Sequence, residues 1–234
     1  MANTQKPLCV ITGVGPGTGA ALVKAFVEKY RVVMIARNQE RLDELAQKYP
    51  DAQPLICDVS KEDELDAAIA EIFTLGQPQV LIHNAVGGGA GDVLSIEPRH
   101  LRRNFEINTM ALLQLIQALA PGMVEAGQGV ILATGNTAAY RGRANFVSFA
   151  PTKAAQRILL ESTARSLGPQ GVHVAYVAID AAIDVPWTRA AMPDAPDTFF
   201  AQPADIANEC FHIAHQPRSA WTFDVMIRPF GETW

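Results

Sequence analysis

The sequence predicts an α/β protein with a Rossmann-like, doubly wound parallel sheet of about seven strands and helices on both faces. Short apolar runs of strand length alternate along the chain with longer amphipathic segments. A glycine-rich segment at 12–19 lies between the first apolar run and the first amphipathic segment. Hydrophobic residues make up 49% of the 234, which is enough for one large core, so we expect residues 1–234 to form a single domain.

The individual elements follow from the hydrophobic pattern. Continuous apolar runs suit the strands of a parallel sheet that is covered on both faces. In chain order these runs are 8–11, 32–36, 54–57, 80–83, 130–133, 172–179 and 221–227. Helical spacing of apolar residues predicts helices at 20–30, 39–48, 61–74 (with Ser60 as N-cap), 98–125 (bent near Pro121), 149–167 and 204–215. The segment 186–203 is rich in proline and alanine, and we expect a loop or a mobile lid there.

The charge and cysteine content argue against several classes of protein. With 19 Lys and Arg against 24 Asp and Glu, the net charge of −5 offers no large basic field to nucleic acid. The three cysteines are too widely spaced for a disulfide framework or a zinc site, so no metal is expected. We see neither a signal peptide nor an apolar run approaching the roughly 20 residues of a membrane span. A soluble cytoplasmic protein that binds neither nucleic acid nor a membrane is expected.

The segment 12–19 has the composition of a phosphate-binding loop. Glycines let the backbone turn tightly and approach a pyrophosphate, and the following helix N-terminus offers free N–H groups. Its position between a strand and a helix is the one that a dinucleotide-binding loop requires, although an ordinary glycine-rich turn is the alternative. The residues expected to contact the cofactor are Gly13, Gly15, Gly17, Thr18 and Gly19.

Arg37 follows the second predicted strand, where a dinucleotide-binding fold reads the adenosine ribose. An acidic residue there would favour a free 2′-hydroxyl, whereas a guanidinium offers a forked donor to a 2′-phosphate. Arg37 therefore favours NADP(H) over NAD(H), with a solvated surface arginine as the alternative.

The motif Thr-Gly-x-x-x-Gly-x-Gly at 12–19 resembles the cofactor motif of the short-chain dehydrogenase/reductase family. Further motifs of that family follow in the family's order over nearly the whole chain. Asp58-Val59 resembles the pair that meets the adenine ring in that family. Asn84-Ala85 resembles part of its Asn-Asn-Ala-Gly motif. The resemblance implies that these residues contact the cofactor, that the substrate is a small molecule, and that the protein is a homodimer or homotetramer.

The resemblance extends in part to the family's catalytic residues. Asn108 matches the helix asparagine that holds a proton-relay water, and Lys153 matches the lysine that holds the nicotinamide ribose. The position of the family's proton-donating tyrosine is taken here by Phe149, and that of its serine by Asn136. A phenyl ring neither donates nor accepts a proton, whereas an amide still donates a hydrogen bond to a substrate oxygen. The chain thus resembles a divergent branch of the family.

Tyr140 is a candidate to replace the missing phenol, because it follows the fifth predicted strand, four residues after Asn136. The alternative is a packing residue at the mouth of the cleft.

Two functions remain open from the sequence. The first is an NADP(H)-dependent oxidoreductase that transfers hydride to or from a small, fairly apolar carbonyl compound, alcohol or activated alkene. The second is a non-catalytic relative that binds the cofactor as a sensor or serves as an assembly protein.

Overall fold

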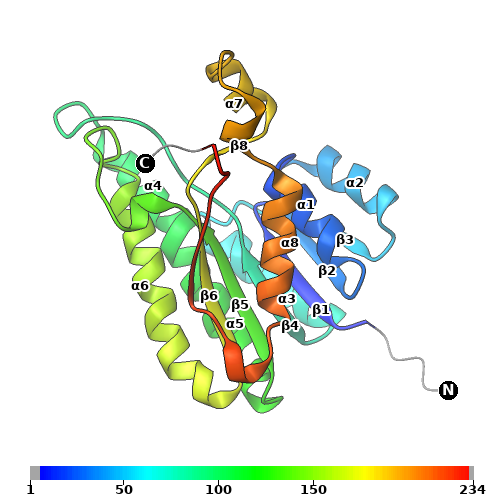
Figure 1. Cartoon of the computed structure of the whole chain (residues 1–234). Helices are drawn as coiled ribbons and strands as arrows, with labels where there is room; N and C mark the ends of the chain where they lie inside the picture. Colours follow the sequence, from blue (N-terminus) through cyan, green and yellow to red (C-terminus); the bar gives the residue numbers. More distant parts are fainter. Residues whose placement is uncertain (1–5, 232–234) are drawn as a thin grey trace.

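The strands of the computed structural model, which describes residues 6–231, form one parallel sheet in the order β3-β2-β1-β4-β5-β6-β9 (Figure 1). This confirms the predicted fold class and the seven-stranded sheet. The strands are β1 (Leu8–Thr12), β2 (Arg31–Ala36), β3 (Ala52–Ile56), β4 (Pro78–His83), β5 (Gly129–Gly135), β6 (Val172–Ile179) and β9 (Asp224–Ile227). The order reverses between β1 and β4, and such a switch point opens a crevice beyond the carboxyl ends of the strands.

Helices cover both faces of the sheet and enclose two hydrophobic cores. One core lies beneath α1 (Thr18–Phe26), α2 (Gln39–Lys48) and α8 (Pro203–Ala214). The other lies beneath α3 (Glu62–Leu75), α5 (Ala111–Glu125) and α6 (Ala150–Leu167). The central strands are buried on both faces, which explains why their sequences are continuous apolar runs.

Several predicted boundaries are wrong, for local reasons. The first helix ends at Phe26, and Tyr30 is buried instead by packing its ring on Phe26 at 5.8 Å. Helix α3 begins after Lys61, because Ser60 donates its hydroxyl to the carboxylate of Asp58 rather than capping the helix. The last strand begins at Asp224, because Trp221 stacks on a neighbouring histidine outside the ladder.

The predicted helix 98–125 is interrupted, but not at its proline. It consists of α4 (Pro98–Phe105), a wide π-helical turn η1 (Glu106–Met110) and α5, which continues through Pro121. Such wide turns occur frequently at functional sites, and this one contains Asn108.

In length and mean hydropathy, the helical stretch Pro98–Glu125 qualifies as a candidate membrane span, the single one among the described residues. Its most apolar window is 44% buried inside the protein, and core helices of soluble proteins satisfy the same criterion.

The segment 186–203 is not the loop that its composition predicts. It contains α7 (Pro186–Ala191), a short 3₁₀ turn η4 (Asp197–Phe199) and β8 (Phe200–Ala201), which pairs with β7 (Ala182–Ile183). Pro186 and Pro203 each occupy the first position of a helix, where proline is favourable because the N–H that it lacks has no helical partner. Its prolines therefore mark helix starts rather than loop.

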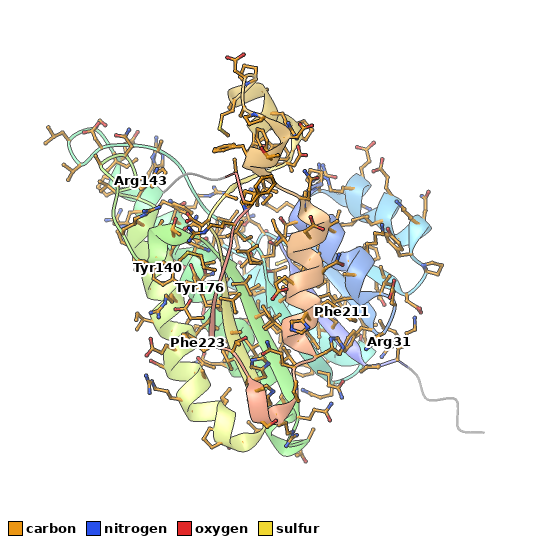
Figure 2. All side chains as sticks on the ribbon, viewed as in Figure 1. Arg31, Tyr140, Arg143, Tyr176, Phe211 and Phe223 are labelled. Carbon is orange, nitrogen blue, oxygen red and sulfur yellow. The ribbon has the colours of Figure 1, made fainter. Side chains whose placement is uncertain are left out.

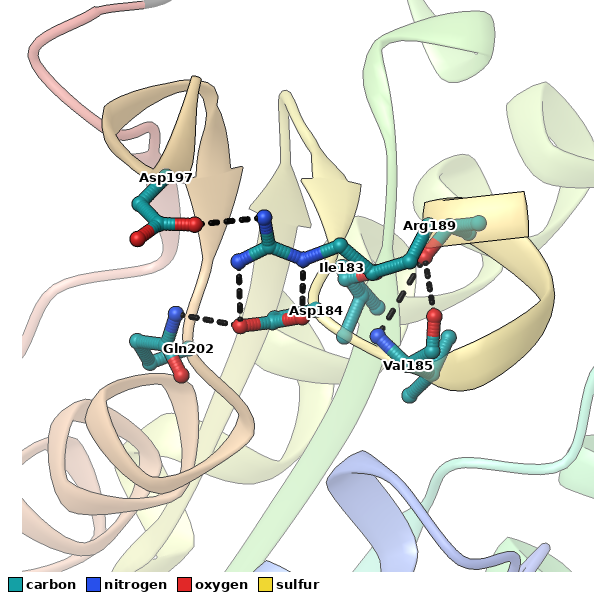
Figure 3. Close-up of polar contacts among 7 residues, drawn as sticks. Ile183, Asp184, Val185, Arg189, Asp197 and Gln202 are labelled. Carbon is teal, nitrogen blue, oxygen red and sulfur yellow. Dashed lines mark hydrogen bonds and ion pairs between the residues drawn. The ribbon is translucent and has the colours of Figure 1, made fainter. Parts of the chain in front are cut away.

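The side chain of Arg189 connects separate parts of this segment (Figure 3). Its guanidinium binds both carboxylate oxygens of Asp184, at 2.7 and 2.8 Å, and reaches Asp197 at 2.6 Å. Gln202 donates to Asp184 from the other side at 2.7 Å, and the Arg189 guanidinium carbon lies 4.0 Å from the centre of the Phe200 ring. The hydrogen bonds, first from Arg189 and then from Gln202, lower the pKa of Asp184 to about 2. We name residues 182–203 the lid.

Candidate functional site

A cleft of about 890 Å³ lies beyond the carboxyl ends of the strands. The loop between β1 and α1, the ends of β2, β3 and β4, and the lid line this cleft. Ten of the eleven residues predicted to contact a cofactor line it, and Lys153 does not. The ten are Gly13, Gly15, Gly17, Thr18, Gly19, Arg37, Asp58, Val59, Asn84 and Ala85.

The glycine loop is held against the end of β4 at a distance that excludes side chains. Gly13 has φ +69°, and a Cβ atom there would lie 2.4 Å from the backbone nitrogen of Ala85. Asn84 fixes the contact by donating from Nδ2 to the Gly13 carbonyl oxygen at 2.8 Å. Gly13 therefore serves both the turn and the close approach of two backbones.

Thr18 opens α1 with a buried hydroxyl that has no hydrogen-bond partner among residues 6–231. Only 7% of the residue is exposed, and it lines the cleft beside the glycine loop. Buried hydroxyls without partners are rare in folded proteins, because such a group loses its bond to water without replacing it. A helix N-terminus beside a cleft, with an unpartnered hydroxyl next to it, fits a ligand that carries phosphate oxygens.

Two arginines, Arg37 and Arg41, line the end of the cleft beyond β2. Arg37 has 68% of its side chain exposed and lies 3.9 Å from the carboxylate of Asp58, which Arg103 approaches at 3.8 Å. Burial would raise the pKa of Asp58, but the hydrogen bonds from Ser60 and the charges of the two arginines lower it overall.

Arg41 was missed from the sequence. It lies in the first turn of α2, whose N-cap Asn38 accepts the Arg41 N–H at 2.8 Å, and both residues line the cleft. The signal was present, because an Asn-x-x-Arg pattern directly after a strand places the arginine one turn from that strand's end.

Lys153 lies in the first turns of α6 and is 1% exposed. Its Nζ donates to the Thr134 carbonyl oxygen at 3.1 Å and to Oε1 of Gln156 at 2.5 Å. Burial lowers the pKa of Lys153 to about 7. Gln156 was not singled out in the sequence, because a lone glutamine three residues after a lysine carries no distinctive pattern.

Asn108 is held rigidly in η1. Its Nδ2 donates to the Gly87 carbonyl oxygen and to the Thr152 hydroxyl, both at 2.8 Å, while its Oδ1 accepts the Gly87 N–H at 2.8 Å. Its main-chain carbonyl oxygen accepts Nε2 of Gln156 at 2.7 Å. The side chain thus ties the loop after β4 to α6.

Phe149 is the N-cap residue of α6, and its carbonyl oxygen accepts the Lys153 N–H at 3.2 Å. Its ring packs edge-on against Phe146 at 6.0 Å and lies beneath the glycine-rich loop after β4, where a Cβ on Gly88 would be 3.8 Å away. The Phe149 side chain therefore presents an apolar surface beside this loop.

Asn136 follows β5 as the N-cap of a short 3₁₀ turn η2 (Thr137–Ala139). Its Oδ1 accepts the Ala138 N–H at 3.1 Å, which assigns the amide orientation and leaves Nδ2 as the group able to donate to a ligand. The hydroxyl of Tyr176, buried in β6, accepts the Asn136 main-chain N–H at 3.2 Å and fixes its backbone.

Tyr140 donates its hydroxyl to the carboxylate of Asp224 in β9, and its ring lies edge-on to that of Tyr176 beside it (Figure 2). The guanidinium of Arg157 lies over its ring at 5.1 Å. Burial, together with the hydrogen bond to Asp224, raises the pKa of Tyr140 to about 12. These contacts hold the Tyr140 phenol against Asp224.

His83, at the end of β4, is fully buried between two partners. Nε2 donates to the Ile107 carbonyl oxygen at 2.9 Å, so Nδ1 accepts the Thr12 hydroxyl at 3.0 Å. Burial, followed by the charge of Lys153, lowers the pKa of His83 to about 3, so the ring stays neutral. It joins β1, β4 and η1.

The lid contributes cleft residues that the sequence did not indicate, among them Val185, Trp187 and Thr188. A Cβ on Gly17 would lie 2.7 Å from the side chain of Val185, so the lid rests directly on the glycine loop. The sequence did not indicate that these residues line the cleft, because the prolines of this segment suggested a loop.

Comparisons with known proteins agree with this architecture. The family model for short chain dehydrogenases matches residues 7–192. The 7alpha-hydroxysteroid dehydrogenase of Escherichia coli is 30% identical over 95% of this chain and 92% of its own length. The L-xylulose reductase of Bos taurus is 29% identical over 70% of this chain and 67% of its own. The structure of a metagenomic short-chain oxidoreductase in complex with NADP superposes with a TM-score of 0.84 at 25% identity, covering 97% of this chain and 99% of the other. The chain belongs to the short-chain dehydrogenase family.

Proposed function

We propose that this protein is an NADP(H)-dependent oxidoreductase with a non-standard active site. The observation that carries the proposal is the cleft beside the glycine loop, with the orphaned Thr18 hydroxyl at a helix N-terminus and two arginines at the far end. Several solved relatives are NADP(H) complexes, which supports a nicotinamide cofactor.

Arg37 and Arg41 favour NADP(H) over NAD(H). Both line the cleft beyond β2, where the ribose of a bound dinucleotide lies in this fold. Two guanidinium groups suit a 2′-phosphate, because each offers several donors in a fixed plane. The nearby carboxylate of Asp58 is already close to Arg37 and Arg103, which reduces its repulsion of a phosphate.

The bound cofactor would supply or accept a hydride, and the chain's own residues would orient the substrate. We assign Asn136 Nδ2 to donate to a substrate oxygen, because its Oδ1 is already occupied by Ala138. We assign Lys153 to the nicotinamide ribose, as the family resemblance implies. Phe149 would contribute an apolar wall.

The absence of a phenol at Phe149 bears on the substrate class. A positioned general acid contributes roughly 10²–10⁴-fold to a rate, and Phe149 offers none. Reduction of an alkene conjugated to a carbonyl suffers less, because hydride adds to carbon and the resulting enolate takes its proton from solvent. We propose a small, fairly apolar carbonyl compound, alcohol or activated alkene as the substrate.

The second candidate function is a non-catalytic cofactor sensor or assembly protein, and the observation that favours it is this same loss of proton chemistry. A sensor would bind the cofactor in the same cleft as the oxidoreductase would, so the two candidate functions differ in hydride transfer alone. NADPH oxidation with a panel of enones and ketones separates them. Turnover of any of these supports the oxidoreductase, and binding without turnover supports the sensor.

For the protein as a whole we propose a single domain over residues 1–234, a homodimer or homotetramer, and a cytoplasmic location without a nucleic-acid or membrane partner. Light scattering of the purified protein measures the assembly.

The test of the proposed function is a paired calorimetric titration with NADPH and NADH. Tight binding that is selective for NADPH is the expected result. Absence of binding for both dinucleotides would overturn the proposal for this cleft, and equal affinities would overturn the role of Arg37 and Arg41.

A further inference from the structure

Lys153 sits in a closed network of amides and hydroxyls. Its Nζ reaches Gln156, and Gln156 reaches the Asn108 carbonyl oxygen, whose side chain in turn binds Thr152 and the Gly87 backbone. Lys153 is 1% exposed, and Gln156, Asn108 and Thr152 are each 0% exposed. The whole network is therefore shielded from bulk solvent.

Gln156 is the centre of this network, because its amide is used at both ends. Oε1 accepts from Lys153 Nζ at 2.5 Å, and Nε2 donates to the Asn108 carbonyl oxygen at 2.7 Å. The acceptor oxygen of Asn108 becomes reachable because the chain widens into the π turn η1 at this point. Gln156 thus bridges Lys153 and the main chain of Asn108 directly.

An amide at this place differs chemically from a water. Water both accepts and releases protons, whereas a carboxamide neither gains nor loses one near neutral pH. The protonated amine has three N–H bonds, so the two acceptors that the structure shows for Nζ, Thr134 and Gln156, leave one for a ligand. A lysine in this setting is held in place without a route for its protons along α5 and α6.

We propose that Gln156 is a positioning residue that holds Lys153 and closes the proton path between it and solvent. Lys153 then acts as a fixed donor to the cofactor rather than as a link in a proton relay. A reaction at this site takes its proton from the open side of the cleft, which favours substrates such as conjugated alkenes. The proposal rests on the proposed function for the identity of the ligand, but the closed path is a property of the protein alone.

The experiment is an NMR measurement of solvent exchange at the Lys153 Nζ protons in the cofactor-free protein, at a pH below the pKa of Lys153. Two substitutions separate water entry from the loss of hydrogen bonds. Gln156→Ala leaves a void that admits water, because a cavity of about 10–15 Å³ suffices. Gln156→Leu removes the same hydrogen bonds but keeps most of the bulk. Gln114→Ala is the control, since that glutamine is half-buried on α5, away from the network, and binds Asp66.

Slow exchange is expected in the wild type, with an increase of about tenfold or more in Gln156→Ala and at most about threefold in Gln156→Leu, because water must reach the amine. Gln114→Ala should match the wild type. Rapid wild-type exchange, like that of surface lysines, would overturn the proposal without any variant. Equal acceleration in Ala and Leu would also overturn it, because loosening of the helix would then explain both.

NADPH affinity of the wild type is measured in parallel. Failure to bind NADPH would contradict the proposed function and leave the exchange result intact, so the two conclusions fail independently.

Discussion

At the scale of a single residue, the burial of Lys153 affects both its protonation and the stability of the fold. Lys153 is buried with its Nζ bonded to the carbonyl oxygen of Thr134 and the amide oxygen of Gln156, and that burial lowers its pKa from 10.5 to about 7. A buried lysine of this kind persists because carbonyl oxygens satisfy its hydrogen bonds, although the charged form remains costly in a low-dielectric interior. The protonation state of Lys153 should therefore couple to the stability of the fold.

This coupling predicts a pH dependence. Between pH 7 and 10.5 the unfolded chain holds a lysine proton that the folded protein has released, so raising the pH through this window favours the folded state. The unfolding free energy should rise by up to about 1.4 kcal/mol per pH unit from this group. Lys153→Met should remove the slope. Urea denaturation of both proteins at several pH values in this window measures it, and parallel curves would contradict the assignment.

The cofactor preference predicts a second residue-scale effect. Arg37→Ala or Arg41→Ala should weaken NADPH binding by about tenfold or more, because a hydrogen bond to a charged group is worth about 1.5–3 kcal/mol. NADH binding should change little, since it lacks the 2′-phosphate. Arg165→Ala is the matched control, because Arg165 pairs with Glu161 on the exposed side of α6. Equal losses for the two dinucleotides would count against a 2′-phosphate site.

The proposed catalytic positions, Phe149 and Asn136, predict a gain of function. Restoring a phenol and a hydroxyl with Phe149→Tyr and Asn136→Ser should raise ketone reduction, with an upper range of roughly 10²–10⁴-fold for a positioned acid. Steady-state rates on a ketone panel measure the effect, and the Tyr140→Phe variant should change them little, because that phenol is committed to Asp224. No gain on any ketone would indicate that the cleft serves another substrate class.

At the scale of elements, the lid shows how a segment with weak local signals becomes ordered. Arg189 binds both Asp184, near the start of the lid, and Asp197, which lies eight residues after Arg189. The two-residue pairing of β7 with β8 closes the base of the lid. Val185 then rests on Gly17, so the lid and the glycine loop share one wall of the cleft. A loss of order in the lid should therefore weaken the binding of a ligand beside the glycine loop.

Arg189→Ala tests this connection. Hydrogen exchange across residues 182–203 should accelerate, because the side chain that joins the two ends is gone, while exchange in β1 and β5 stays unchanged. NADPH affinity should fall several-fold, since less of the protein holds the binding-competent lid. Mass spectrometry of the exchanged peptides and calorimetry measure the two effects. Unchanged exchange in the lid would show that backbone pairing alone orders it.

At the scale of the whole molecule, the cleft is built from segments that are distant in the chain but adjacent at one edge of the sheet. Residues 13–19, the ends of β2, β3 and β4, and the lid meet there because parallel strands present their carboxyl ends together. A ligand in this cleft contacts both sides of the switch point between β1 and β4. Its binding should therefore stabilise the entire fold.

Thermal unfolding measures this stabilisation. At a concentration about 100 times its dissociation constant, NADPH should add about 2.7 kcal/mol to the unfolding free energy. For a domain of this size that corresponds to a rise in melting temperature of roughly 5–11 °C. NADH at the same concentration should give a smaller rise. An equal melting temperature with and without NADPH would contradict binding in the cleft.

The sequence by itself determined the sheet, most of the helices and the glycine-loop wall of the cleft, because these depend on local periodicity and on glycines at fixed spacing. The limits of α2 at 39–48 and of β6 at 172–179 agree with the prediction, since continuous patterns define them. The place of Arg41 beside the cleft could also be predicted from the sequence, because the residue lies in the first turn of α2.

Only the tertiary structure decided the surroundings of Lys153. The Gln156 bridge depends on a π turn at Asn108 and on the packing of α6 against it, neither of which leaves a local signature. The lid likewise depends on Arg189, which binds two carboxylates at once. One of them, Asp197, lies eight residues further along the chain, and composition does not indicate this pairing. Local patterns specify the elements, whereas the burial and the partners of a polar group depend on which elements meet.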